Sequence, residues 1–201
     1  MIRLYLVTDR RLVPDLVAAV RAALSSLPPG VAAVQLREKD LPAAALLDLA
    51  SRLLPVCKAA SAPLLINDRV DVARAAGADG VHLPSRGLPV AQARALLGPN
   101  RLVGVSCHAP EEIAAAYSDG ADFALFGPVW DSPGKAARGA AALKDAVRAA
   151  PFPVLAIGGV TAETASQAME AGAAGVACIR AVLGGADPGA AARELYLAAS
   201  L

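Results

Sequence analysis

The sequence predicts a single (β/α)₈ barrel domain over residues 1–201, and three observations lead to this fold class. Eight short apolar runs are nearly continuous and rich in β-branched residues, as parallel strands are when both of their faces are buried. Alanine-rich segments of helical length separate these runs. A joint of helix, glycine and strand recurs at Gly77, Gly120 and Gly172, which indicates a repeated βα unit.

The predicted elements alternate along the whole chain. The predicted strands are residues 2–8, 32–37, 63–67, 80–83, 102–106, 123–127, 154–158 and 175–179. The predicted helices are residues 14–27, 41–60, 69–76, 89–97, 110–118, 140–149, 162–171 and 188–199. Some helix starts carry sequence signals. Pro110 with Glu111 and Glu112 suits a first turn, and Thr161 is a predicted N-cap with Thr164 at the capping-box position.

A doubly wound sheet is the competing architecture. It would need fewer strands and a glycine-rich turn after the first strand. The first strand here ends in Val7-Thr8-Asp9-Arg10, without a glycine. The eight alternating strand and helix segments therefore favour the closed barrel.

The composition excludes several classes of protein. The chain has 19 basic and 18 acidic residues and no broad basic stripe, so nucleic acid is not expected as a partner. No apolar run is long enough to span a membrane, and the N-terminal segment lacks the apolar stretch of a signal peptide. The widely spaced Cys57, Cys107 and Cys178 fit neither a disulfide framework nor a zinc site, and they predict a reducing, cytoplasmic setting.

The carboxyl ends of the strands are where this fold builds its functional site. The second predicted strand leads into Gln35-Leu36-Arg37-Glu38-Lys39. Gln35 and Arg37 share one face because side chains alternate along a strand. The planar donor fork of arginine and the point charge of Lys39 suit a phosphate or diphosphate. The alternative interpretation is a strand end that carries a solvated run of charges.

The third and fifth strand ends add polar groups. Asn67 can donate to a phosphate oxygen, and Asp68 can hold Mg²⁺, which proteins bind with one or two carboxylates plus water and substrate phosphates. The alternative is that Asn67 or Asp68 caps the helix that follows. Ser106 can bind a phosphate oxygen. Its neighbours Cys107 and His108 point in opposite directions on a strand, so a catalytic dyad is not expected.

Two histidines and one loop have structural expectations. We expect His108 to orient the adjacent loop or the next helix, and His82, inside the fourth strand, to be hydrogen-bonded in the core. The segment after the sixth strand is the longest irregular stretch, and its Lys135 could close over a ligand. The alternative is an ordinary flexible connection, with Trp130 packed at its hinge.

Gly158 and Gly159 follow the seventh strand and precede a helix, so backbone N–H groups can approach an anion there. Phosphate sites in this fold often lie after strands 7 and 8, and the eighth strand leads into Arg180. Two anion sites are thus predicted in one mouth. The first contains Gln35, Arg37, Lys39, Asn67, Ser106 and Lys135, and the second contains the Gly158–Gly159 turn and the residues near Arg180. We therefore expect two phosphorylated reactants, or one reactant with two anionic ends.

Motifs spread over nearly the whole chain resemble the thiamin phosphate synthase/TenI family. In order, they are YLVTD, VQLREK, INDRVDVARAAGADGVHL, GVSCH, FGPV, AIGGVT and GAAGVACI. The resemblance implies a (β/α)₈ barrel of the thiamin pathway that is often a homodimer. It also implies a synthase that couples hydroxymethylpyrimidine diphosphate to a thiazole phosphate, with diphosphate leaving with the help of Mg²⁺.

The resemblance also implies a role for each site residue. Diphosphate binding falls to Gln35, Arg37, Lys39, Asn67, Ser106 and Lys135. Asp68 is the implied magnesium ligand, and Gly158, Gly159 and the backbone around Ile179 bind the thiazole phosphate. Fixed donors such as Arg37, Lys39, Ser106 and Lys135 can stabilise the charge that develops on a departing diphosphate.

The sequence departs from both branches of this family. Gly87 stands where synthases carry the aspartate that is their second magnesium ligand, and Arg86 is a candidate cation in its place. Leu83-Pro84-Ser85 is the TenI-type sequence, yet Pro128 stands where TenI tautomerases carry their catalytic histidine. Three functions follow: a thiamin phosphate synthase, which we favour, a TenI-like thiazole tautomerase, and a non-catalytic binder of a thiamin-pathway phosphate.

Overall fold

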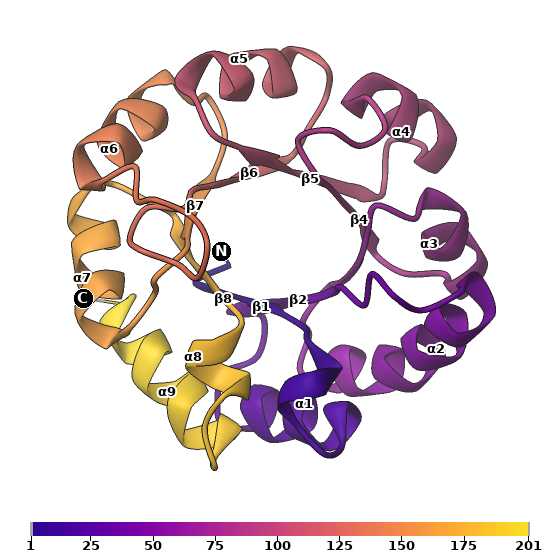
Figure 1. Cartoon of the computed structure of the whole chain (residues 1–201). Coiled ribbons are helices and arrows are strands. Elements are labelled where there is room, and N and C mark those ends of the chain that lie inside the picture. Colours follow the sequence, from indigo (N-terminus) through magenta and orange to yellow (C-terminus); the bar gives the residue numbers. More distant parts are fainter. Residues whose placement is uncertain (1, 201) are drawn as a thin grey trace.

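The computed structural model describes residues 2–200 and contains a closed barrel of parallel strands (Figure 1). The strands are β1 (Leu4–Val7), β2 (Ala32–Leu36), β3 (Leu64–Asn67), β4 (Gly80–Leu83), β5 (Leu102–Cys107), β6 (Phe123–Phe126), β7 (Val154–Ile157) and β8 (Gly175–Cys178). They follow chain order around the barrel, and β1 pairs with β8 to close the sheet. The predicted fold class is confirmed.

Helices surround the barrel on its outside (Figure 1). They are α1 (Leu16–Ser25), α2 (Ala43–Ala59), α3 (Val70–Ala76), α4 (Val90–Leu97), α5 (Pro110–Ser118), α6 (Ala140–Ala149), α7 (Ala162–Glu170) and α9 (Pro188–Ala198). All of these lie within the predicted helical ranges. Two further helices, η1 (Arg10–Leu12) and α8 (Arg180–Leu183), were not predicted, because three or four residues are too few to show a helical period.

The predicted signals at helix ends are confirmed. Thr161 Oγ1 accepts a hydrogen bond from Thr164 N at 3.3 Å, and Thr164 Oγ1 accepts one from Thr161 N at 2.7 Å. This reciprocal pair caps α7. Gly77, Gly120 and Gly172 have φ angles of 69°, 93° and 92°, which residues with a Cβ rarely adopt. The repeated joint therefore ends three helices in one way and returns the chain to the barrel.

The strands separate two apolar cores. The larger core lies between the barrel and the helices. The smaller core fills the barrel itself and consists of Tyr5, Val7, Ala33, Leu65, Phe123, Leu125, Leu155 and Ala177. Gln35 and His82 belong to the same inward-facing side of the sheet, and both are buried. Polar side chains thus enter the interior of the barrel, and this occurs close to the cavity described below.

Gly104 makes room for aromatic rings inside the barrel. The ring centroids of Tyr5, His82 and Phe123 lie 5.5, 5.8 and 5.9 Å apart in pairs. A Cβ on Gly104 would lie 2.3 Å from Phe123 Cζ and 2.7 Å from His82 Nδ1. The absence of a side chain on β5 therefore allows two rings from neighbouring strands to occupy the interior.

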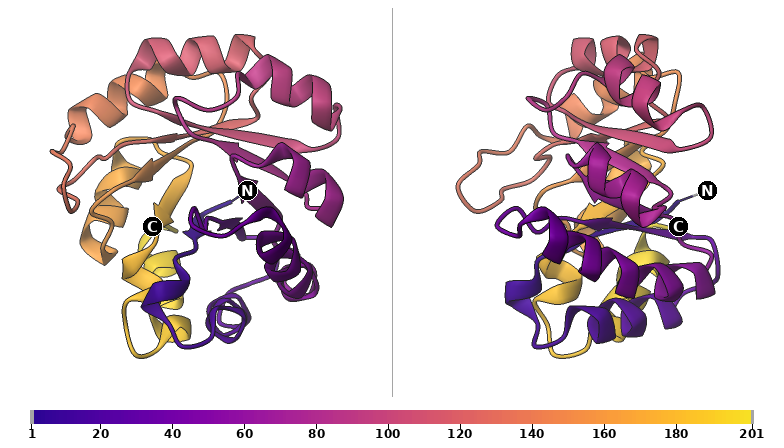
Figure 2. Two further views of the ribbon diagram at one scale, coloured as in Figure 1. Left: turned by 45° about the vertical axis from the view of Figure 1, so that its right-hand side comes forward. Right: turned by 90° about the vertical axis from the view of Figure 1, so that its right-hand side faces the viewer.

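The longest connection lies between β6 and α6. Residues 127–139 reach out beyond the barrel in the right-hand view of Figure 2. In Figure 1 the same segment lies beside the end of β7, and Val129 N donates to Ile157 O of that strand. Over residues 2–200, no helix is both long enough and apolar enough to cross a membrane.

We predict that Gly104→Ala lowers the free energy of unfolding by about 1–3 kcal/mol, the usual cost of adding volume to a packed core. Gly185→Ala is the matched control, because a Cβ on Gly185 would meet no atom within 4 Å. Urea unfolding followed by circular dichroism measures both changes. Equal effects of the two substitutions would contradict the steric role of Gly104.

Candidate active site

A cavity of about 640 Å³ opens at the carboxyl ends of the strands, and every strand contributes to its wall. The residues predicted to bind the substrates line it: Gln35, Arg37, Lys39, Asn67, Ser106, Lys135, Gly158, Gly159, Ile179 and Arg180. Asp68 and Arg86 are not among the lining residues. The two predicted anion sites therefore share one cavity, and the predicted metal ligand lies at its margin.

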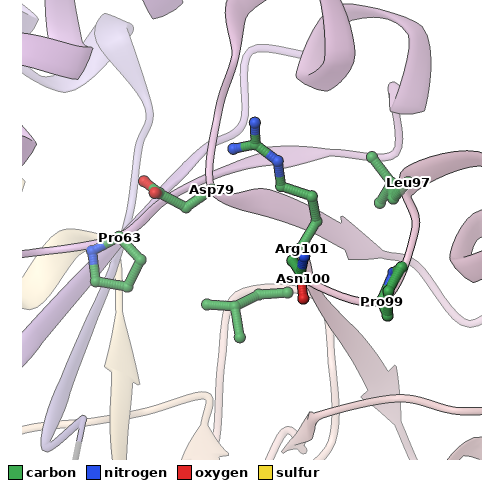
Figure 3. Close-up of a pocket in the computed structure, with 7 residues that line it drawn as sticks. Pro63, Asp79, Leu97, Pro99, Asn100 and Arg101 are labelled. Atoms are coloured by element: carbon green, nitrogen blue, oxygen red, sulfur yellow. The ribbon is translucent and has the colours of Figure 1, made fainter.

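A second cavity of about 510 Å³ lies near the amino ends of β3, β4 and β5 (Figure 3). Its charged side chains are held by neighbouring backbone groups. Asp79 accepts a hydrogen bond from Leu64 N at 2.8 Å. Arg101 donates to the carbonyl oxygens of Gly77 and Ala78 at 3.2 and 2.6 Å. Because these charges stabilise the turns of the barrel, we place function in the first cavity.

The cations of the first predicted anion site form no ion pair with the described residues of the protein. Arg37 N donates to Thr8 Oγ1 at 2.9 Å, which fixes the end of β2. Within the described residues, the side chains of Arg37, Lys39 and Lys135 form no salt bridge. Their positive charge is therefore available to an anionic ligand.

A buried carboxylate, Glu38, lies between Arg37 and Lys39 in the sequence and joins two strand ends beside the cavity. Glu38 is 5% exposed and accepts a hydrogen bond from Thr8 Oγ1 at 2.6 Å. Its two oxygens also accept from Arg10 N, each at 3.1 Å. The Arg10 guanidinium donates to Glu38 at 3.2 Å and to the exposed Asp40 at 2.7 and 2.8 Å. Glu38 thus joins the ends of β1 and β2 and leaves Arg37 and Lys39 facing the cavity.

The Arg10 guanidinium also affects the exposed carboxylate beside it. Hydrogen bonding to Arg10 lowers the pKa of Asp40 to about 2. Asp40 is therefore ionised in the physiological pH range and balances the charge of Arg10 outside the cavity. The sequence alone did not show that Glu38 and Asp40 pair with Arg10 while Arg37 and Lys39 line the cavity.

Asn67 and Asp68 do not cap the helix that follows them. The N-cap of α3 is Arg69, and no side chain caps this helix. Asp68 has a φ of 64°, and its N–H donates to the carbonyl oxygen of His82 at 2.9 Å. The capping interpretation of these two residues is therefore wrong. The turn leaves Asn67 on the cavity wall and exposes the Asp68 side chain.

Asp68 lies beside the glycine at the altered metal position. A Cβ on Gly87 would lie 2.8 Å from Asp68 Oδ1, so the two segments are close. Among residues 2–200, no group of three or more His, Cys, Asp or Glu side chains could hold a metal ion. A magnesium site here has to draw its remaining ligands from water and substrate oxygens.

His82 and Ser106 meet on the wall of the cavity. His82 Nε2 lies 2.9 Å from Ser106 Oγ, and the imidazole is 2% exposed. Burial, together with the nearby charge of Arg37, lowers the pKa of His82 to about 3, so the ring is neutral at physiological pH. The prediction of a hydrogen-bonded core histidine is confirmed, and the structure adds that this histidine also lines the cavity.

Cys107, the last residue of β5, and His108, which follows it, face opposite directions, as predicted, and His108 lines the cavity. Cys107 is packed in the outer core, and burial raises the pKa of its thiol to about 12, which removes it as a nucleophile. His108 Nδ1 lies 2.5 Å from the carbonyl oxygen of Gly127, and its backbone N–H donates to Glu112 at 2.6 Å. His108 therefore orients both the loop after β6 and helix α5.

The loop after β6 packs closely against Gly158 and Gly159 at the end of β7. Val129 N donates to Ile157 O at 2.9 Å. A Cβ on Gly158 would lie 2.5 Å from Pro128 Cβ, and a Cβ on Gly159 would lie 2.6 Å from Trp130 Cβ. Trp130 also donates to Gln167 of α7 at 3.2 Å, in keeping with the predicted packing at the hinge. These glycines thus allow close packing of the loop, and both of them line the cavity.

Two parts of the cavity were missed by sequence reasoning. Arg180 was predicted, but the short helix α8 that it begins after β8 and Ile179 was not, and the second residue of that helix, Ala181, also lines the cavity. Asp9 and Arg11 also line it and form a bidentate ion pair, with both distances 2.8 Å. The charged sequence after β1 is the signal that could have identified them, because it too follows the carboxyl end of a strand.

Comparisons with known proteins agree with the geometry. A family model described as thiamine monophosphate synthase matches residues 4–182. A thiamine-phosphate synthase of Anaeromyxobacter dehalogenans is 47% identical over 92% of this chain and 83% of that protein. One from Roseiflexus castenholzii is 43% identical over 95% and 85%. The solved structure of a thiamine phosphate pyrophosphorylase from Pyrococcus furiosus is 34% identical, has a TM-score of 0.91, and covers 99% of this chain and 96% of that one.

We predict that Glu38→Gln lowers the free energy of unfolding by about 1–3 kcal/mol, because buried donors lose a charged acceptor. Asp40→Asn is the control: it neutralises an exposed partner of the same arginine, and it is expected to have a much smaller effect. Urea unfolding of the two variants measures the difference. A loss for Asp40→Asn as large as that for Glu38→Gln would refute the anchoring role of the buried carboxylate.

Proposed function

The chain belongs to the thiamine monophosphate synthase family, and from this premise we propose that it joins hydroxymethylpyrimidine diphosphate to a thiazole phosphate with release of diphosphate. The observation that carries the proposal is the single cavity in which two anion-binding groups of residues face one space. An enzyme that joins a diphosphate and a monophosphate needs both groups around one reaction centre.

The first anion site supports the leaving of diphosphate. The bond between the pyrimidine methylene carbon and the diphosphate oxygen breaks, and its electron pair stays with the departing diphosphate. In this proposal Arg37, Lys39, Ser106 and Lys135 donate to that oxygen and its neighbours as their negative charge grows. Gln35 and Asn67 orient the same group. Donors fixed in advance stabilise such a charge more in the transition state than in the ground state.

The second anion site supports the acceptor substrate. In this proposal Gly158 and Gly159 offer backbone N–H groups to the thiazole phosphate, and Ile179 and Arg180 bind it from the end of β8. The thiazole nitrogen then donates its electron pair to the methylene carbon, which forms the new C–N bond. Both sites open on the same cavity, so the nucleophile and the leaving group can lie on opposite sides of that carbon.

We also propose Mg²⁺ as cofactor, held by Asp68. The residues present fit a site with one protein carboxylate, because magnesium usually keeps several waters and binds substrate phosphates directly. When bound, the ion would neutralise part of the diphosphate charge. Gly87 contributes no carboxylate, and the exposed Arg86 does not line the cavity. The protein side chains Arg37, Lys39 and Lys135 would carry the rest of the neutralisation.

The alternative functions have less support than the synthase reaction, although His108 does line the cavity. A tautomerase needs a base, and Pro128 stands at the position that would supply it. His108 has its Nδ1 bonded to the Gly127 carbonyl oxygen, and Cys107 faces the outer core. A binder without activity would use the same unpaired cations, and what favours the synthase over it is that relatives 43% and 47% identical are thiamine-phosphate synthases. We therefore propose only the synthase reaction.

We further propose a cytoplasmic location and a homodimer, both implied by the family resemblance. Cys57, Cys107 and Cys178 are buried free thiols, which supports a reducing compartment. Light scattering on the purified chain measures its mass in solution, and a monomeric mass would contradict the dimer.

We predict that Lys135→Ala lowers kcat for diphosphate release by about 100-fold, the size of effect seen when a donor to a developing oxyanion is removed. Lys144→Ala is the control, because Lys144 is exposed on α6 and does not line the cavity. A coupled assay for diphosphate with both substrates and Mg²⁺ measures the rates. Absence of product from the unaltered protein at high concentration would refute the synthase proposal.

We predict that Asp68→Asn raises the Mg²⁺ concentration required for half of the maximal rate, because an amide is a weaker ligand than a carboxylate. Calorimetry of Mg²⁺ binding in the presence of inorganic diphosphate gives a readout that does not depend on turnover. Asp48→Asn, on the exposed face of α2, is the control. Unchanged magnesium binding in Asp68→Asn would exclude Asp68 as the ligand.

A further inference from the structure

His82 has one nitrogen without a hydrogen-bond partner. Of the buried side-chain nitrogen and oxygen atoms in the described part of the chain, only His82 Nδ1 lacks one. The other ring nitrogen, Nε2, lies 2.9 Å from Ser106 Oγ. One ring nitrogen of this buried imidazole is hydrogen-bonded and the other is not. This difference limits which nitrogen carries the proton.

No polar atom of the described residues lies within hydrogen-bonding reach of Nδ1. A Cβ built on Gly104 would lie 2.7 Å from Nδ1, so this nitrogen faces the backbone of β5 at close range. The rings of Tyr5 and Phe123 lie 5.8 and 5.9 Å from the imidazole, centroid to centroid. The groups around Nδ1 therefore offer no acceptor for an N–H at this position.

Because Nδ1 has no hydrogen-bond partner, one tautomer of the neutral ring is favoured. A neutral imidazole has one N–H donor and one lone-pair acceptor. A proton on Nδ1 would leave a buried N–H without an acceptor, and orphaned N–H groups are rare inside proteins. A proton on Nε2 leaves only a lone pair unsatisfied and gives Ser106 Oγ a donor. The Nε2–H tautomer is therefore the one that the packing favours.

This tautomer fixes what the Ser106 hydroxyl can do. Its oxygen accepts from His82 Nε2–H, so its own proton cannot point back at the ring. Within residues 2–200 the hydroxyl has no other hydrogen-bond partner, and Ser106 lines the cavity. We propose that His82 is a positioning residue that holds Ser106 Oγ as an acceptor and so directs the Ser106 proton toward the anion bound in the cavity.

This inference rests on the proposed function, in which that anion is the departing diphosphate. A hydroxyl free to rotate would present lone pairs to the anion for part of the time, and those would repel it. A hydroxyl whose oxygen already accepts from His82 has one of its two lone pairs occupied, and its proton is turned away from the ring toward the cavity. The donor is thus oriented before the substrate arrives, which is the condition under which electrostatic stabilisation is most effective.

Nitrogen-15 NMR of the labelled protein tests the tautomer directly. The chain has two histidines, so a spectrum of His108→Gln assigns the signals of His82. In spectra that correlate ring nitrogens with ring carbon-bound protons, Nε2 couples to both protons and Nδ1 mainly to one. We expect the protonated nitrogen to be the one coupled to both. A protonated Nδ1, or a doubly protonated ring at neutral pH, would overturn the proposal.

Variants of both residues test the action of His82 through Ser106. His82→Asn places its amide too far from Ser106, and we expect kcat to fall by about tenfold, the typical worth of one hydrogen bond. His82→Gln carries an amide N–H as far out as Nε2 and is expected to recover most of that loss. In a Ser106→Ala background, His82→Asn should cause no further loss.

The outcomes separate this inference from the proposed function. A tenfold loss from His82→Asn in the Ser106→Ala background as well would show a structural role and overturn the inference. Thermal unfolding of each variant identifies those that fail to fold. The NMR measurement needs neither substrate nor variant of His82. A protein with the predicted tautomer but without synthase activity would refute the function alone, and an active protein with a protonated Nδ1 would refute this inference alone.

Discussion

Hydrogen bonding between β1 and β8 closes the sheet and brings the first and last strands of the chain side by side. Leu4 lies opposite Val176, and Leu6 lies opposite Cys178. Closure places the carboxyl ends of all eight strands on one ring, so that segments separated by more than a hundred residues share one cavity. The cavity, the two groups of predicted anion-binding residues that line it and the loop that borders it all depend on this closure.

The polar side chains buried in the barrel gather at that same end. Thr8, Gln35, Glu38 and His82 are the buried polar or charged residues of the described chain. Burial of a polar group costs free energy unless it is hydrogen-bonded, and three of these four are engaged in short hydrogen bonds. Gln35 makes a longer contact of 3.4 Å with Tyr5. The free-energy cost of burying these polar groups is incurred where their hydrogen bonds fix residues that line the cavity.

Charge in this protein is arranged locally, because the formal net charge is only +1. Arg10, which follows β1, is paired with Glu38 and Asp40 outside the cavity. Arg37 and Lys39 lie on the same segment as those two carboxylates, after β2, but they stay unpaired and line the cavity. Glu38 and Asp40 turn toward Arg10 in the segment that follows β2, which ends at Leu36, and Arg37 and Lys39 turn toward the cavity. A substrate with two phosphate-bearing ends would therefore meet cations that the protein has not already neutralised.

The sequence by itself determined the barrel and most of the cavity. Apolar runs, the glycines after the helices and the position of each polar residue after a strand are local features, and parallel strands bring their carboxyl ends together whatever the details. Tertiary structure decided the rest. It showed that Glu38 is an anchor rather than part of a charged patch, that Asp68 lies at the margin beside Gly87, and that one nitrogen of His82 is vacant. These properties belong to contacts between segments distant in sequence, and a pattern within one segment cannot specify which atoms of another segment it will meet.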